Sequence, residues 1–392
     1  MAFYKMDKVY DRILEKASRA RIPVMSSFEL LPVCNLNCKM CYVRKPMSEV
    51  RQAGGLKDAA WWLALAKDAA DCGLLFPLLT GGEPLLHPQF REIFSGMLAM
   101  GLQVSINSNG TLIDRDWAEF FAKYRPTRIN ITLYGASEQS YQDLCGNGDA
   151  FRKVRQGVAL LKEYGIPFKF NASITPQNVQ DLEEMVRYAK ELDAPIQFAT
   201  YMFPPLRRDD TMVGRNERLS PREAALARVT ADFLQSEPEW FVAQTMRYRT
   251  FVPLDQRPWE QGQPQEIGMR CRAGLCSLWV DWQGNFMNCG MYGSVKTSLE
   301  GKTFRQAWDE VVEQTAQVRY APACLSCPNE RLCHPCIAMV NNECGQHYGR
   351  PEYMCQMNQA LVDYYNQFTR EHYPDTIPNF AASADRGDDC EL

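Results

Sequence analysis

Strand-like and helix-like segments alternate between about residues 24 and 202, and this alternation constrains the fold more than any other feature. The strand-like segments are 27–33, 75–81, 102–110, 128–135, 167–175 and 195–203. The helix-like segments between them are 58–73, 88–101, 114–124, 150–165 and 178–193, and several end at glycine. Because each helical crossover returns the chain in the same direction, the repeats predict a parallel sheet. The sequence therefore predicts an α/β fold, a partial (β/α)6 TIM-like barrel rather than a closed barrel of eight strands.

The composition argues against several classes of partner. The 392 residues carry a formal net charge of -4, and no run of lysine and arginine marks a surface for nucleic acid or a membrane. No segment reaches the roughly 18 uninterrupted apolar residues of a membrane span. The first 23 residues are charged and amphipathic, unlike a secretory signal. We therefore expect a cytoplasmic protein that binds neither nucleic acid nor membranes.

The 15 cysteines fall mainly into two zones, one near the start of the chain and one in its last third. In a reducing compartment, clustered cysteines are more often metal ligands than disulfides. Cys34, Cys38 and Cys41 have three and then two residues between them. Three thiolates at this spacing fit three corners of an iron–sulfur cube and leave one iron without a protein ligand. A partial zinc site and three unrelated core cysteines are the alternatives, although zinc sites usually pair C-x2-C motifs and close all four positions.

This cysteine loop, with Tyr42 directly after the third cysteine, resembles that of the radical S-adenosylmethionine (SAM) enzymes. In that family the loop holds a four-iron cluster, and SAM chelates the open iron. Gly81, Gly82 and Glu83 follow the second strand-like segment and resemble the family's GGE motif, which holds the methionine amino group of SAM. Glycines at such a turn let backbone approach a ligand closely. An ordinary glycine-rich turn with a solvated glutamate is the alternative.

Short polar residues follow the next two strand-like segments. Ser108 and Asn109 resemble the family's residues near the carboxylate and ribose of SAM, and Thr132 is a candidate for ribose contact. Plain turns contain the same residue types. The family commonly has aspartate where this chain has Tyr134.

The resemblance implies a mechanism. An external flavodoxin-type or ferredoxin-type donor reduces the cluster, and the C5′–S bond of SAM breaks. The resulting 5′-deoxyadenosyl radical abstracts a hydrogen atom from the substrate. The cofactors supply this chemistry, and the protein positions them and excludes water.

The C-terminal cysteines resemble the SPASM extension of radical SAM peptide-modifying enzymes, which carries two auxiliary four-iron clusters. The resemblance assigns one set of ligands to auxiliary cluster I: Cys271, Cys276, Cys289 and Cys336. It assigns a second set to auxiliary cluster II: Cys324, Cys327, Cys333 and Cys355. Only two residues separate Cys333 from Cys336, where the family has three, and Cys344 is the alternative to Cys355. A zinc knuckle is the other interpretation of this region. Three [4Fe-4S] clusters and SAM are therefore expected.

These patterns divide the chain into five parts. They are an N-terminal helical segment (1–23), the radical SAM partial barrel (24–215), a helical bridge (216–268), the SPASM-type iron–sulfur domain (269–356) and a C-terminal helix with an acidic tail (357–392). Cys72, Cys145, Cys344 and Cys390 are left as core, loop or tail thiols.

The resemblance favours a peptide maturase that forms a crosslink, thioether or C–C, in a ribosomally made peptide. No spare N-terminal domain is present to bind a leader peptide, so a separate recognition protein or direct docking on the barrel is expected. Sulfatase-maturing relatives have a basic aspartate where this chain has Gly290, which disfavours that reaction, and no catalytic base is identified. A small-molecule oxidoreductase acting on a tetrapyrrole or an aminoglycoside is one alternative, and a non-catalytic zinc scaffold is the other.

Overall fold

The computed structural model describes residues 3–203, 218–257, 265–266, 269–334, 336–346 and 348–376. The predicted acidic tail, 384–392, and the parts 216–217, 258–264 and 267–268 of the predicted bridge lie outside these residues. None of the helices in the described part of the chain combines the length and apolar character needed to span a bilayer.

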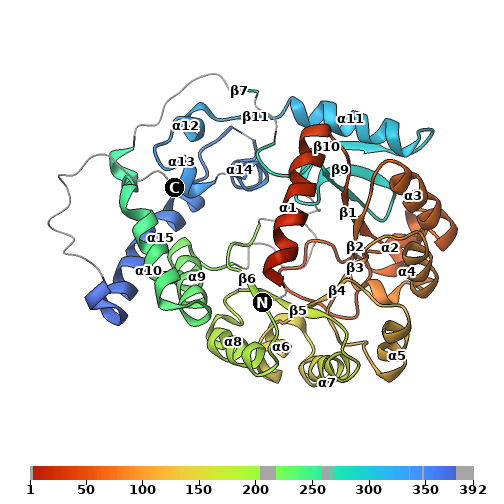
Figure 1. Ribbon diagram of the computed structural model, residues 1–392, viewed down its shortest axis with the longest axis horizontal. Helices are drawn as coiled ribbons and strands as arrows, with labels where there is room; N and C mark the ends of the chain where they lie inside the picture. Colours follow the sequence, from red (N-terminus) through yellow and green to blue (C-terminus); the bar gives the residue numbers. More distant parts are fainter. Residues whose placement is uncertain are drawn as a thin grey trace.

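A curved sheet forms the centre of the molecule, and its core is the predicted partial barrel (Figure 1). Strand β1 (Met25–Glu29) begins two residues before the predicted segment 27–33 and ends within it. The other parallel strands lie within the segments that the sequence predicts: β2 (Phe76–Thr80), β3 (Ser105–Ser108), β4 (Arg128–Thr132), β5 (Phe168–Ser173) and β6 (Ile196–Ala199). The predicted α/β partial barrel is confirmed.

Helices cover the outer face of the barrel (Figure 1). They are α3 (Ala59–Asp71), α4 (Phe90–Ala99), α5 (Arg115–Lys123), α6 (Glu138–Cys145), α7 (Asp149–Glu163) and α8 (Leu182–Glu191), with α2 (Met47–Gln52) in the loop after β1. Asp58 and Asp114 begin α3 and α5 because each side chain accepts a backbone N–H of the first turn, from Trp61 and Trp117 respectively. These local signals explain why the segments fold where the sequence predicts.

A hairpin at 277–289 extends the sheet of the barrel. Strand β8 (Ser277–Val280) pairs in parallel with β1, and β9 (Asn285–Cys289) and β10 (Tyr292–Ser298) follow antiparallel. The order of the sheet is β10-β9-β8-β1-β2-β3-β4-β5-β6. The cysteine-rich region is thus hydrogen-bonded to the first strand of the barrel.

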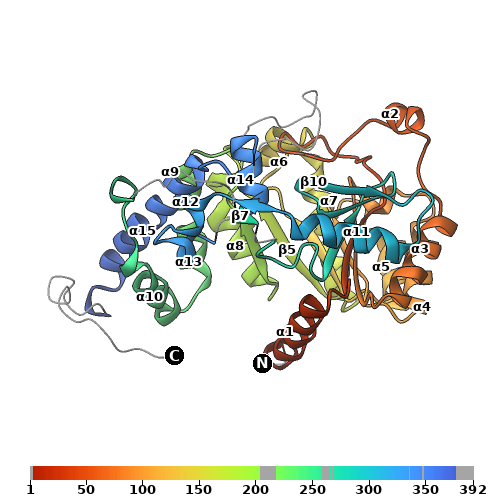
Figure 2. The same cartoon turned by 90° about the horizontal axis from the view of Figure 1, so that it is seen from above.

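The remaining helices and strands surround this sheet. Helix α1 (Phe3–Ala20) lies on the opposite side from α2 and α6 (Figure 2), and Tyr10 packs against Phe76, the first residue of β2. A helical group covers the other flank: α9 (Pro221–Gln235), α10 (Pro238–Arg247) and α15 (Glu352–His372). The C-terminal region adds α11 (Phe304–Ala316), α12 (Pro322–Leu325), α13 (Glu330–Cys333), α14 (Ile337–Cys344) and the small ladder of β7 (Gln265–Glu266) with β11 (Arg319–Tyr320).

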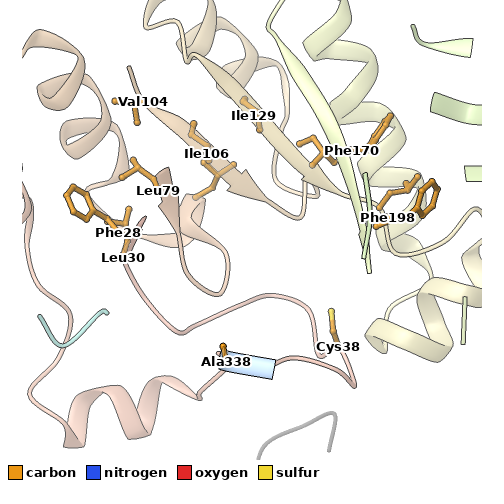
Figure 3. Packing of buried hydrophobic residues seen from close by; sticks show 14 of the residues in the cluster. Phe28, Leu30, Cys38, Leu79, Val104, Ile106, Ile129, Phe170, Phe198 and Ala338 are labelled. Carbon is orange, nitrogen blue, oxygen red and sulfur yellow. The ribbon is translucent and has the colours of Figure 1, made fainter. Parts of the chain in front are cut away.

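The two faces of the barrel sheet differ in chemistry. Residues such as Ile106, Ile129 and Phe170 belong to the large apolar core shared with the helices (Figure 3). The alternate residues are polar, and Asn130 Nδ2 donates to Asn107 Oδ1 at 2.8 Å. In the next row towards the carboxyl ends, Thr132, Asn171 and Gln197 are register partners. The inner face of the barrel is therefore lined by amide and hydroxyl groups, whereas parallel sheets usually bury apolar residues on both faces.

Candidate active site and iron–sulfur centres

The loop with the three N-terminal cysteines follows the carboxyl end of β1 and pairs with the end of α6. Asn37 N donates to the carbonyl of Cys145 at 3.0 Å, and Lys39 N donates to the carbonyl of Leu144 at 2.9 Å. Cys38 is buried between these contacts, beyond the apolar strand core in Figure 3. Parallel strands place their carboxyl-end loops at one edge, which is where ligands bind in such folds.

Neutral donors surround the three thiols. Leu36 N lies 3.4 Å from Sγ of Cys34, Asn109 Nδ2 lies 3.6 Å from the same sulfur, and Arg44 N lies 3.2 Å from Sγ of Cys41. Burial raises the pKa of Cys34 to about 12, so the metal-free site holds protonated thiols. Metal binding would displace these protons, since thiolates are the ligating form. The N–H donors are then positioned to stabilise the charge on the sulfur.

Gly81 and Gly82 allow the chain after β1 to lie directly against the end of β2. Gly82 N donates to the carbonyl of Leu31 at 2.7 Å, and Glu83 N donates to the carbonyl of Val33 at 2.9 Å. A Cβ at Gly82 would lie 2.3 Å from the Val33 carbonyl oxygen, and Gly81 has a φ of +142°. Both positions therefore need glycine because backbone packs directly against them, a role that the sequence analysis missed. Contact of these glycines with SAM stays a prediction.

The side chain of Glu83 is completely buried and connects the ends of β2 and β3. Its carboxylate accepts from Asn109 N at 2.7 Å, from the Ser108 hydroxyl at 3.0 Å and from Leu85 N at 3.2 Å. Burial raises the pKa of Glu83 to about 7, although these three donors act in the opposite direction. Glu83, Ser108 and Asn109 thus form one hydrogen-bonded unit beside Cys34, and their predicted contacts with SAM are untested.

Two side chains outside the predicted ligands touch Cys38. The thiol of Cys145 and the hydroxyl of Tyr134 are each within hydrogen-bonding reach of its sulfur. The contact with Cys145, followed by burial, raises the pKa of Cys38 well above its usual range. Tyr134 thus occupies the position where the resemblance expects aspartate. Thr132 and Tyr42 are both half-buried, Thr132 at the end of β4 and Tyr42 directly after the cysteine loop.

The cysteines assigned to auxiliary cluster II converge on one cavity of about 40 Å³. Cys324, Cys327, Cys333 and Cys355 all line it. Burial raises the pKa of Cys324 and of Cys333 to about 12. Cys344 does not line the cavity and packs against Gly349 instead. The geometry favours Cys355 over Cys344 as the distant ligand.

The cysteines assigned to auxiliary cluster I are less closely grouped. Cys271 and Cys336 line one pocket, and Cys336 also lines the cavity of the other set. Cys276 is buried beside α1, where its sulfur accepts from the Ser18 hydroxyl at 3.1 Å. Cys289 ends β9 and accepts from Met291 N at 3.4 Å. Neither Cys276 nor Cys289 lines the pocket that the other two share.

No three His, Cys, Asp or Glu side chains among the described residues are grouped closely enough to hold a single metal ion. A structural zinc site needs four ligands on one centre, with zinc–sulfur bonds of about 2.3 Å. A four-iron cluster spreads its ligands over separate irons.

Comparison with known proteins identifies the barrel. The radical SAM superfamily matches residues 28–189, which include the cysteine loop and the segment from Gly81 to Glu83. The chain carries a radical SAM domain. The prediction of a radical SAM enzyme is confirmed, and the family uses SAM with a four-iron cluster, a group that the Cys34, Cys38 and Cys41 thiols fit.

Curated relatives extend the similarity beyond the radical SAM domain. The AdoMet-dependent heme synthase of Methanosarcina barkeri is 24% identical over 348 residues, covering 84% of this chain and 96% of the relative. The subtilosin biosynthesis protein AlbA of Bacillus subtilis is 22% identical over 326 residues, covering 80% and 67%. The PqqA peptide cyclase of Gluconobacter oxydans is 30% identical over 173 residues, covering 44% and 47%.

Solved structures share the fold across the radical SAM domain and the C-terminal region. SuiB of Streptococcus suis has a TM-score of 0.63 at 17% identity, covering 89% of this chain and 82% of SuiB. The structure of anSMEcpe with bound AdoMet has a TM-score of 0.65 at 18% identity, covering 88% and 97%. The predicted architecture, a radical SAM barrel followed by a SPASM-type region, is confirmed.

Gly290, which lies beyond the radical SAM domain, is enclosed by an aromatic side chain. A Cβ at this position would lie 2.7 Å from the ring of Trp279. The indole N–H of Trp279 donates to Glu29 Oε2 at 3.1 Å, so the ring is fixed from its other side. An aspartate could not enter here unless Trp279 moved, which agrees with the absence of that base from the sequence.

Proposed function

We propose that the protein modifies a ribosomally made peptide by oxidative radical chemistry. The observation that carries the proposal is the presence of two kinds of cysteine site in one fold. One is the loop with Cys34, Cys38 and Cys41, and the other is the set of four cysteines assigned to auxiliary cluster II, which lines one small cavity. The first kind suits radical generation, and the second suits electron transfer without substrate ligation.

In the proposed mechanism, Cys34, Cys38 and Cys41 hold the first cluster. Tyr42, Gly81, Gly82, Glu83, Ser108, Asn109 and Thr132 line the SAM site. When bound, the cluster and SAM supply a 5′-deoxyadenosyl radical that abstracts a hydrogen atom from the substrate. The buried Glu83 unit fixes the position of Asn109, whose amide reaches Cys34.

The auxiliary cysteines are proposed to hold two further clusters, which take the electron that the substrate radical must lose. Cys271, Cys276, Cys289 and Cys336 would hold cluster I, and Cys324, Cys327, Cys333 and Cys355 would hold cluster II. A flavodoxin-type or ferredoxin-type protein would exchange electrons with the enzyme. The leader peptide would bind either a separate recognition protein or the barrel directly.

The inner face of the barrel supports a peptide substrate. Asn171 places an amide on this face, and Asn107 and Asn130, which hydrogen-bond to each other, add two more amides of the kind that pair with peptide N–H and C=O groups. Peptide-modifying relatives such as AlbA and PqqA cyclase add weight to this choice.

A tetrapyrrole is the second candidate substrate, because the heme synthase of Methanosarcina barkeri matches most of this chain. Tetrapyrrole carboxylates would need cations. Lys169 is the cation in the Asn107–Asn130 row, and its Nζ donates to Gln197 Oε1 at 2.8 Å. The inner face therefore offers more amide and hydroxyl groups than positive charge.

The decisive test uses anaerobically reconstituted enzyme with SAM, dithionite and a short peptide encoded next to the enzyme's gene. We expect 5′-deoxyadenosine and a product peptide lighter by two hydrogen atoms. The variant Cys34→Ala/Cys38→Ala/Cys41→Ala is the control and should give neither product. Turnover of a tetrapyrrole, with the peptide mass unchanged, would establish the second candidate instead.

A further inference from the structure

The cavity lined by Cys324, Cys327, Cys333 and Cys355 contains a positive charge that the radical SAM chemistry does not explain. Arg257 lies at the end of the short 3-10 helix Leu254–Gln256 and lines this cavity. Its Nη1 is 3.8 Å from Sγ of Cys327, and its Cζ is 5.3 Å from the ring centre of Phe251. The guanidinium is therefore held between an aromatic ring and the cysteines.

Within the described residues, the guanidinium of Arg257 lacks hydrogen-bond partners for some of its N–H groups. Its Nε and Nη2 are buried there and have no hydrogen-bond partner. Buried polar groups are nearly always paired, and an exception often marks a missing ion or ligand. A charged donor that is left unpaired is especially costly.

The other charged residues that line the cavity have partners of opposite sign. Arg350 Nε lies 3.1 Å from a carboxylate oxygen of Glu352, and Glu330 is paired with Arg270. Within the described part of the chain, no such ion pair balances Arg257. A cluster held by four thiolates carries net negative charge, and it would supply the missing counter-charge and the missing acceptors.

We propose that Arg257 is a positioning residue for auxiliary cluster II, and that its guanidinium raises the reduction potential of that cluster by donating to its sulfur atoms. This inference rests on the proposed function, which places the cluster there. One electron enters the cluster on reduction, no proton moves and no ligand bond breaks. A nearby cation stabilises the more negative, reduced state more strongly than the oxidised state.

A raised potential would suit cluster II as the acceptor for the electron that the substrate radical loses. The substrate is oxidised by one electron, and cluster II is reduced by one. A one-electron carrier of the ferredoxin or flavodoxin class then reoxidises cluster II.

The test measures the potential of cluster II in the full-length chain by redox titration followed with electron paramagnetic resonance. The background is Cys34→Ala/Cys38→Ala/Cys41→Ala, which removes the signal of the first cluster. In this background, Arg257→Gln should make reduction at least tenfold less favourable, a shift of about 59 mV to more negative potential. Arg257→Lys keeps the positive charge, so its potential should stay close to that of the protein with Arg257. Arg305→Gln is the matched control, since Arg305 is an exposed arginine of α11 that is paired with Asp309 and lines neither cysteine pocket, and it should leave the potential unchanged.

The iron content of the Arg257 variants also supports or overturns the proposal. If Arg257→Gln loses the iron of one cluster and Arg257→Lys keeps it, the positive charge is needed to hold the cluster, which supports the proposal. An unchanged potential with full iron content, or equal iron loss in both variants, would overturn it. Iron analysis of Cys355→Ala separates the two proposals. If Cys355→Ala and Cys344→Ala both keep all their iron, cluster II itself is absent and the proposed function fails with it.

Discussion

The two best-formed cysteine sites differ in the number of thiols and in the charge of the groups around them. Near β1, neutral backbone and amide N–H groups contact Cys34 and Cys41. In the C-terminal region, the four cysteines assigned to auxiliary cluster II line one cavity together with Cys336, and Arg257 and Arg350 lie in its wall. Three thiolates would leave one iron of a four-iron cluster open to SAM, whereas four would complete the shell, and Arg257 adds positive charge. The number of ligands thus separates a reactive site from an electron-transfer site, and the surrounding charge adjusts the potential of each.

The largest effect should come from removing the three-thiol site. We expect Cys34→Ala/Cys38→Ala/Cys41→Ala to make no 5′-deoxyadenosine while it retains about two-thirds of the iron, because the two auxiliary clusters remain. Iron and sulfide analysis with chromatography of the nucleoside measures both quantities. Cys72→Ala is the control, since this half-buried thiol at the end of α3 belongs to neither site. Normal nucleoside production by the triple variant would contradict the assignment.

The second effect tests whether Cys355 or Cys344 is the distant ligand of the four-thiol site. Cys355→Ala should lose about a third of the iron and fail to modify the substrate, yet still cleave SAM, because only the four-thiol site is damaged. Cys344→Ala should keep its iron, since Cys344 does not line the cavity. The reverse pattern would exchange the roles of these two residues.

A third, smaller effect concerns the pH dependence of the metal-free protein. Burial raises the pKa of Glu83 from 4.5 to about 7, so the folded chain binds this proton more tightly than the unfolded chain. The resulting stabilisation is fully present below pH 4.5 and is lost as pH rises through about 7. Wild-type protein should lose about 3 kcal/mol of unfolding free energy over this range relative to Glu83→Gln, which cannot ionise. Urea denaturation at several pH values measures the difference, and parallel curves for the two proteins would contradict it.

The smallest effect tests the close approach between the cysteine loop and β2. Gly82→Ala places a methyl group against the Val33 carbonyl and should cost about 1–3 kcal/mol of unfolding free energy. It should also lower iron loading at the first site while the four-thiol site fills normally. Gly293→Ala is the matched control, because nothing lies within 4 Å of a Cβ there. Equal iron loading in the two variants would show that the loop tolerates the displacement.

The sequence predicted the barrel well because its evidence is local. Strand composition and helix caps such as Asp114 are encoded within a few residues, and parallel strands bring their following loops to one edge. Helix α11 was not predicted, although Thr303 and Gln306 form a capping box that could have indicated its start.

Contacts between distant segments were not predictable in the same way. The alternation of residues 277–289 is typical of a hairpin, but nothing in it specifies β1 as the neighbouring strand. The burial of Glu83 depends on donors from β3, and Arg257 lies in a stretch that the sequence analysis assigned to a bridge. Such contacts depend on tertiary packing, so a single sequence carries no local signal for them.

The pairing of β8 with β1 also affects how the protein folds during its synthesis. Trp279 and Glu29 meet across 250 residues of chain, so the edge of β1 stays without its neighbour until the C-terminal region has left the ribosome. An exposed strand edge invites pairing with other chains. Shortened proteins that end before the hairpin should therefore aggregate instead of yielding an isolated barrel. The cysteine-rich region thus contributes to the folding of the radical SAM barrel.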